Sequence, residues 1–138
     1  HAPPTGGTAL ISVRDVDKPG VVKVARDLVS LGFALAATAG TADTLEQAGL
    51  IVRRVNKVLE GRPHIVDMIK NDEADIIINT TEGRRAIADS AAIRATAETL
   101  RVFYTTTLAA AEAICMALQH EGDQTVRRLQ DLHRSIRA

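Results

Sequence analysis

Three consecutive isoleucines, Ile76 to Ile78, leave few choices for the fold of this chain. Asp75 and Asn79 bound the run, and a short apolar run with polar ends is typical of a strand covered on both faces. Strands of this kind occur in parallel sheets, because the crossover helices of such a sheet pack on both sides. The run therefore predicts a parallel sheet between two layers of helix.

Four further segments have the apolar character of strands, and segments with helical spacing alternate with them. The other expected strands are residues 9–13, 33–37, 50–55 and 102–104. The expected helices begin near residues 17, 41, 63, 89, 108 and 124. This alternation indicates an α/β sandwich of three layers with a mostly parallel sheet. The 50–55 segment is polar enough to lie at an edge of that sheet.

Capping residues predict where the first two helices begin and end. Asp17 is expected to cap the first helix, with Pro19 in the first turn and Gly32 after the end. Thr41 is expected to cap the second helix, which Gly49 closes.

The composition argues against several classes of function. Lys and Arg (17) balance Asp and Glu (17), so the chain lacks the basic field that attracts nucleic acids and acidic membranes. No apolar run reaches the length of a membrane span, and the first residues lack the pattern of a signal peptide. The single cysteine, Cys115, favours a reducing compartment, so we expect a cytoplasmic protein. We expect one domain over residues 8–138, after a linker or expression remnant at residues 1–7.

Polar residues gather where three of the expected strands end. They are Ser12 to Lys18, Thr38 to Thr41 and Asn79 to Arg85. Ligands of α/β proteins bind outside the carboxyl ends of the strands, so these clusters predict a ligand site. In Thr38-Ala39-Gly40-Thr41 two hydroxyls flank a glycine at a strand-to-helix turn, where helix N–H groups favour an anion. Plain structural roles stay open: caps for the threonines and solvated surface positions for Lys18 and Lys57.

Longer motifs resemble a known family. Lys57-Val58-Leu59-Glu60-Gly61-Arg62-Pro63-His64-Ile65 and Ile77-Ile78-Asn79-Thr80-Thr81-Glu82-Gly83-Arg84-Arg85 look like the carboxy-terminal regulatory domain of the carbamoyl phosphate synthetase large chain. Ser12-Val13-Arg14 and Thr38-Ala39-Gly40-Thr41-Ala42 fit the same pattern, which runs from about Thr8 to the end. The wider superfamily resembles methylglyoxal synthase.

The resemblance implies a methylglyoxal-synthase-like fold with a five-stranded parallel sheet in the order 3-2-1-4-5. It also implies an allosteric domain that binds nucleotide monophosphates, with UMP as inhibitor and IMP as activator in bacterial members, and ornithine bound nearby. The family's nucleotide site, carried over by position, falls on Ser12, Lys18, Thr38, Gly40, Thr41, Lys57, Asn79 and Thr81. Contacts on the ornithine side fall on Tyr104 and Thr106.

Two positions depart from the family's pattern. Ala39 stands where some members have histidine, which alters a contact near the phosphate. Thr105 stands where the best-known bacterial pattern has an aspartate beside the ornithine ammonium. The resemblance therefore supports nucleotide binding better than ornithine activation.

Three kinds of function stay open. For a regulatory domain the resemblance implies no catalysis, no metal and no cofactor in this chain, with ATP and Mg²⁺ confined to other domains of a ligase. Its implied partners are those large-chain domains and the small glutaminase chain. A methylglyoxal-synthase-type phosphate lyase would need a carboxylate base where this chain has Glu60-Gly61-Arg62. A structural module with a vestigial site, whose remaining task is assembly, is the third alternative. The last helix either packs against the domain or presents its arginine face to another subunit.

Overall fold

A computed structural model describes residues 7–56, 67–68, 71, 73–80, 95 and 102–120 of the chain. Within them five strands form one parallel sheet in the order β3-β2-β1-β4-β5. The strands are β1 (Gly7–Ser12), β2 (Phe33–Thr38), β3 (Val52–Val55), β4 (Ile76–Asn79) and β5 (Phe103–Thr105). The predicted fold class and strand order are thereby confirmed. Polar β3 lies at an edge, and Arg53 and Arg54 on it are exposed.

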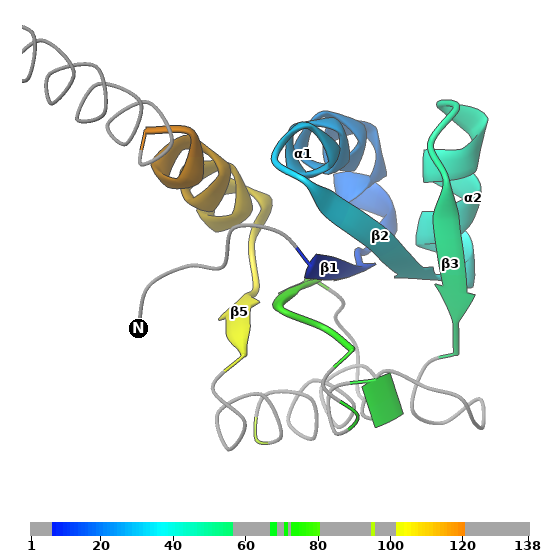
Figure 1. The fold of residues 1–138 in the computed structure, drawn as a ribbon. Helices are drawn as coiled ribbons and strands as arrows, with labels where there is room; N and C mark the ends of the chain where they lie inside the picture. The colour runs from blue at the N-terminus through cyan, green and yellow to red at the C-terminus, as the bar shows by residue number, and fades with distance from the viewer. Residues whose placement is uncertain are drawn as a thin grey trace, which may run out of the picture.

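Helices cover one face of this sheet. They are α1 (Lys18–Ser30), α2 (Ala39–Gln47) and a helix over residues 108–120. Figure 1 shows all three on the same side of the strands. Among the described residues, no helix combines the length and the apolar character that crossing a membrane requires. The helices expected from residues 63, 89 and 124 fall wholly or mostly outside the described residues.

The larger core lies between the sheet and these helices. Alternate strand residues point into it, because successive side chains of a strand face opposite sides. From α1 it takes Val21, Val24, Ala25 and Leu28, which recur at helical spacing. Each is at most 1% exposed, and full burial of a valine or leucine stabilises the fold by roughly 1.5–3 kcal/mol. Cys115 joins the same core from the 108–120 helix.

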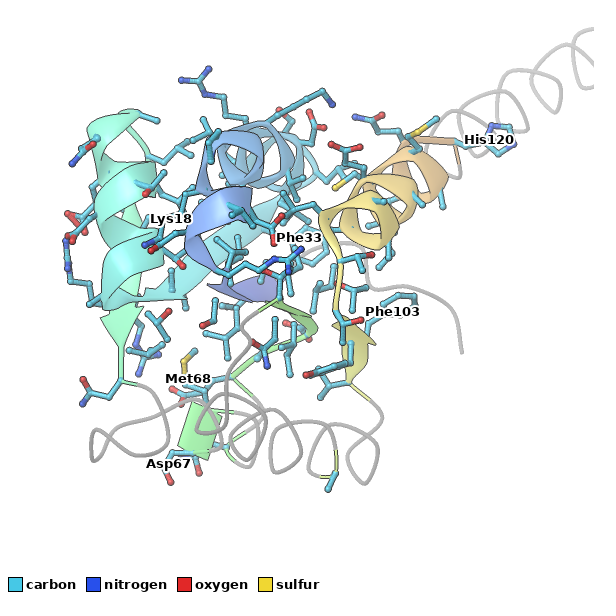
Figure 2. The ribbon with its side chains drawn as sticks, turned by 180° about the vertical axis from the view of Figure 1, so that it is seen from behind. Lys18, Phe33, Asp67, Met68, Phe103 and His120 are labelled. Carbon is cyan, nitrogen blue, oxygen red and sulfur yellow. The ribbon has the colours of Figure 1, made fainter. Side chains whose placement is uncertain are left out.

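A smaller core lies on the opposite face. Leu10, Ala36 and Ile77 form it from β1, β2 and β4, and Met68 packs against them. Figure 2 shows Met68 on the side of the sheet away from α1 and α2. The side chains that follow on this face, at the ends of the strands, are polar, and they begin the candidate site.

One predicted helix cap is wrong and the other is right in position only, whereas both predicted stops hold. α2 begins at Ala39 with Thr38 at its N-cap position, so Thr41 lies inside the first turn and does not cap the helix. Asp17 is at the N-cap position of α1, but its side chain does not cap the helix because it binds Arg14 instead. Gly32 and Gly49 follow the helix ends with φ of 97° and 86°, values that glycine adopts without strain.

Candidate functional site

Four polar side chains line up across the carboxyl ends of neighbouring strands, and we call them the polar row: Thr38, Ser12, Asn79 and Tyr104. In the register of the sheet, Ser12 lies opposite Asn79 on β4 and next to Thr38 on β2. Tyr104 comes from β5, where it lies opposite Ile77, and its hydroxyl reaches forward to Asn79. The sheet therefore brings together residues that are far apart in the sequence.

Hydrogen bonds join the polar row in two pairs. The Thr38 hydroxyl donates to Ser12 Oγ at 3.0 Å, and Asn79 Nδ2 donates to the Tyr104 hydroxyl at 3.1 Å. Ser12, Thr38 and Asn79 are only 2–3% exposed, and Tyr104 is half-buried. Hydrogen bonds are electrostatically stronger in such a setting than in water, so the row is a fixed and strongly polar layer of mostly buried side chains.

Lys18 and Gly40 meet two residues after Thr38, although they belong to different helices. A Cβ built on Gly40 would lie 2.9 Å from Lys18 Nζ, so the glycine leaves room for the ammonium group. Figure 2 shows the Lys18 side chain lying between α1 and α2. The ammonium therefore stands at the first turn of α2, where helix N–H groups lack intrahelical partners. Ala39 and Gly40 are exposed there, so an anion can reach this turn.

The loop after β1 is fastened to the first turn of α2 and to the end of β4. The Val13 N–H donates to the Thr41 hydroxyl at 3.0 Å, and the Arg14 N–H donates to the Thr80 hydroxyl at 3.1 Å. The Thr80 N–H in turn donates to the Ser12 carbonyl at 3.0 Å. Thr41 is 1% exposed, and its oxygen already accepts a hydrogen bond. The structure thus gives Thr41 a positioning role beneath the first turn of α2.

Ion pairs hold the 3-10 turn Asp15–Asp17, which leads into α1. Arg14 Nε lies 2.8 Å from Asp17 Oδ2, and Lys18 Nζ lies 2.6 Å from Asp15 Oδ1. The hydrogen bond from Thr80, followed by that from Arg14, lowers the pKa of Asp17 below its usual value. The carboxylate of Asp17 is therefore stabilised in its charged form, and it ties the turn to the end of β4.

Sequence reasoning missed Thr80, Asp15 and the Arg14–Asp17 pair. An Arg and an Asp three residues apart signal an ion pair, but only the sheet register could place Thr80 against Arg14. Of the predicted site residues, Thr106 is exposed just after the end of β5. Lys57 and Thr81 lie outside the described residues. In the described part of the chain, no three His, Cys, Asp or Glu side chains gather as metal ligands would.

Comparison with known proteins identifies the family of this chain. Residues 20–106 match the model of the MGS-like domain. The chain belongs to the MGS-like domain family. The matched segment contains Thr38, Gly40, Thr41, Asn79 and Tyr104, whereas Ser12 and Lys18 precede it.

Relatives of this MGS-like domain include large chains of carbamoyl phosphate synthase. That of Pseudomonas putida is 66% identical over 135 residues, which cover 98% of this chain and 13% of the relative. That of Pseudomonas aeruginosa is 62% identical over 135 residues, with the same coverage. The similarity is to the carboxy-terminal region of those proteins. This chain spans about an eighth of their length.

A solved structure shows the same fold. The crystal structure of methylglyoxal synthase from Elizabethkingia anophelis NUHP1 matches with a TM-score of 0.64, covering 82% of this chain and 79% of that one. The two sequences are 23% identical. The likeness confirms the architecture of the MGS-like domain.

Proposed function

We propose that this chain is the allosteric domain of a glutamine-dependent carbamoyl phosphate synthetase and that it binds nucleotide monophosphates of the UMP and IMP type. The parent would be an ATP-dependent ligase of the cytoplasm, supplying carbamoyl phosphate to pyrimidine and arginine synthesis. Identities of 66% and 62% to large chains, over nearly the whole of this sequence, support that parent. The other large-chain domains and the small glutaminase chain would be the partners.

The single observation that carries the proposal is the approach of Lys18 to Gly40, two residues after Thr38 at the carboxyl edge of the sheet. A phosphate monoester carries nearly two negative charges at neutral pH. Lys18 supplies an ammonium, the first turn of α2 supplies N–H groups, and the hydrogen-bonded hydroxyls of Thr38 and Ser12 together supply an O–H donor. These are the donors that a phosphate requires, and they come from neighbouring elements held in fixed register.

The other end of the polar row suits the nucleoside. Asn79 has an amide that donates and accepts, which fits the edge of a base or a ribose hydroxyl. Its Nδ2 donates to Tyr104, and this bond fixes the orientation of the amide. If each charge-assisted bond to the phosphate nets about 1.5–3 kcal/mol, a few of them leave micromolar binding after the association cost.

Binding at this site would regulate the parent only by favouring one of its conformations. An effector shifts an equilibrium by the difference between its affinities for the two states, so tight binding alone is not regulation. The bound phosphate would link the ends of β1 and β2 to the first turns of α1 and α2. A shift of those elements is how this domain could report occupancy to the rest of a large chain.

Titration calorimetry with UMP, IMP and inorganic phosphate tests the proposal on the 138-residue chain. We expect Thr38→Val to weaken nucleotide binding at least about tenfold, equivalent to ~1.4 kcal/mol, because the shape is kept and the hydroxyl is lost. Thr44→Val is the matched control, since it makes the same change one turn into α2, where the hydroxyl bonds to the Gly40 carbonyl. Equal affinities for wild type and Thr38→Val would contradict the proposed cradle.

The same preparation tests the two alternatives. Release of phosphate from dihydroxyacetone phosphate would show a lyase of the methylglyoxal synthase type. Absence of any binding heat with UMP and IMP at millimolar concentration would favour a structural module. Binding without turnover is the result that we expect.

A further inference from the structure

Lys18 already has an anionic partner in the structure. Asp15 Oδ1 lies 2.6 Å from Lys18 Nζ, so the carboxylate takes one of the three donor directions of the ammonium. The Asp15 side chain is 92% exposed, whereas that of Lys18 is 27% exposed. The ammonium is therefore the more confined of the two groups, and the carboxylate approaches it from the solvent side.

The backbone that carries Asp15 is held in place. The Asp17 N–H donates to the Arg14 carbonyl at 3.0 Å and closes the turn, and the Arg14 N–H donates to Thr80. The Arg14–Asp17 ion pair braces the same turn. Asp15 can therefore leave Lys18 by rotating its side chain, but the turn keeps its carboxylate near the ammonium.

We propose that Asp15 competes with the effector phosphate for Lys18 and so weakens nucleotide binding. This inference rests on the proposed function, because it requires a phosphate beside Lys18. An arriving phosphate must either break the Asp15–Lys18 pair or tolerate a carboxylate next to a dianion. Breaking the pair and placing a carboxylate beside the phosphate both cost free energy. The cost is modest because water and salt screen an exposed carboxylate.

The competition gives the site a property that suits a sensor. An effector must dissociate when its concentration falls, and changes in affinity among variants of one site appear mostly in the dissociation rate. By offering Lys18 a replacement anion, Asp15 favours release of the phosphate. The residue thereby sets the concentration range over which the domain responds.

Calorimetry of UMP and uridine with the 138-residue chain tests the inference. We expect Asp15→Asn to bind UMP about three- to fivefold more tightly at low ionic strength, with a smaller gain at high salt. Uridine has no phosphate, so its binding should not change. The gain in UMP affinity from Asp15→Asn should shrink when Lys18→Gln is present as well, because the ammonium for which carboxylate and phosphate compete is then gone.

Asp43→Asn is the matched control. It removes the same charge from an exposed carboxylate on α2, but Asp43 pairs with Arg54 on β3 rather than with Lys18. Its affinity for UMP should match the wild type. Equal or weaker binding of UMP by Asp15→Asn would overturn the inference, because Asp15 would then only orient Lys18.

The outcomes also separate this inference from the proposed function. Wild-type binding of UMP that Asp15→Asn leaves unchanged overturns the competition and leaves the nucleotide site standing. Failure of both wild type and Asp15→Asn to bind UMP overturns both. A gain that equals the gain for uridine would also count against the competition, since the phosphate would then play no part.

Discussion

Among single residues, Cys115 shows how burial alone sets a chemical property. The thiol lies in the larger core at 1% exposure, where the charged thiolate would lose its hydration. This burial, assisted by the nearby negative charge of Asp27, raises the pKa of Cys115 from 9.0 to about 11. Lys23 acts in the opposite direction but is weaker. The thiol is therefore protonated and inert at neutral pH, as expected of a core cysteine.

The raised pKa predicts a loss of stability at alkaline pH. The unfolded chain releases the thiol proton near pH 9, whereas the folded chain holds it up to about pH 11. The contribution is therefore complete below pH 9 and is lost as the pH rises to 11, to a total of at most about 2–3 kcal/mol. Urea unfolding of wild type and Cys115→Ala at pH values across this range tests this prediction. The difference in free energy of unfolding between the two proteins should change with pH by that amount. Parallel curves for the two proteins would contradict the assignment.

At the scale of elements, the junction between α1 and α2 depends on Gly40. The residue lies in the first turn of α2, where a helical glycine is less stable than alanine. Its place is explained by Lys18, whose ammonium would be 2.9 Å from an added Cβ. The flexible lysine would move aside before the helix did. The helix thus gives up some stability to keep the ammonium at its N-terminus.

Gly40→Ala should separate stability from binding. Because alanine favours the helix, we expect the free energy of unfolding to stay level or rise by up to about 1 kcal/mol. Because Lys18 must move, we expect UMP to bind about tenfold more weakly. Chemical denaturation and calorimetry give the two numbers, and Thr44→Ala on the same helix serves as the control. Weaker binding that merely follows a loss of stability would speak against this role for the glycine.

At the scale of the whole molecule, sequence patterns predicted the sheet better than the site. The isoleucine run of β4 and the alternating helices indicate a parallel α/β fold, because burial on both faces imposes that pattern. The resemblance supplied the strand order. Contacts across the sheet are different in kind, since the pairing of Thr38 with Ser12 depends on register and the approach of Lys18 to Gly40 depends on helix packing. Local rules also misplaced the start of α2, because Thr41 binds the Val13 N–H instead of capping.

The fold and the site together predict that a phosphate ligand stabilises the entire domain. A ligand at one hundred times its dissociation constant adds about 2.7 kcal/mol when it binds only the folded state. For a domain of 138 residues each kcal/mol raises Tm by about 3 °C, so UMP or IMP at that excess should raise Tm by roughly 8 °C. Uridine and inosine, which lack the phosphate, should shift Tm far less, and Thr38→Val should need about ten times more UMP for the same shift. Differential scanning fluorimetry over a range of concentrations measures these shifts. A nucleoside has no phosphate charge for Lys18 and the first turn of α2 to bind. Equal shifts of Tm with UMP and uridine would therefore mean that the carboxyl edge of the sheet does not hold the phosphate.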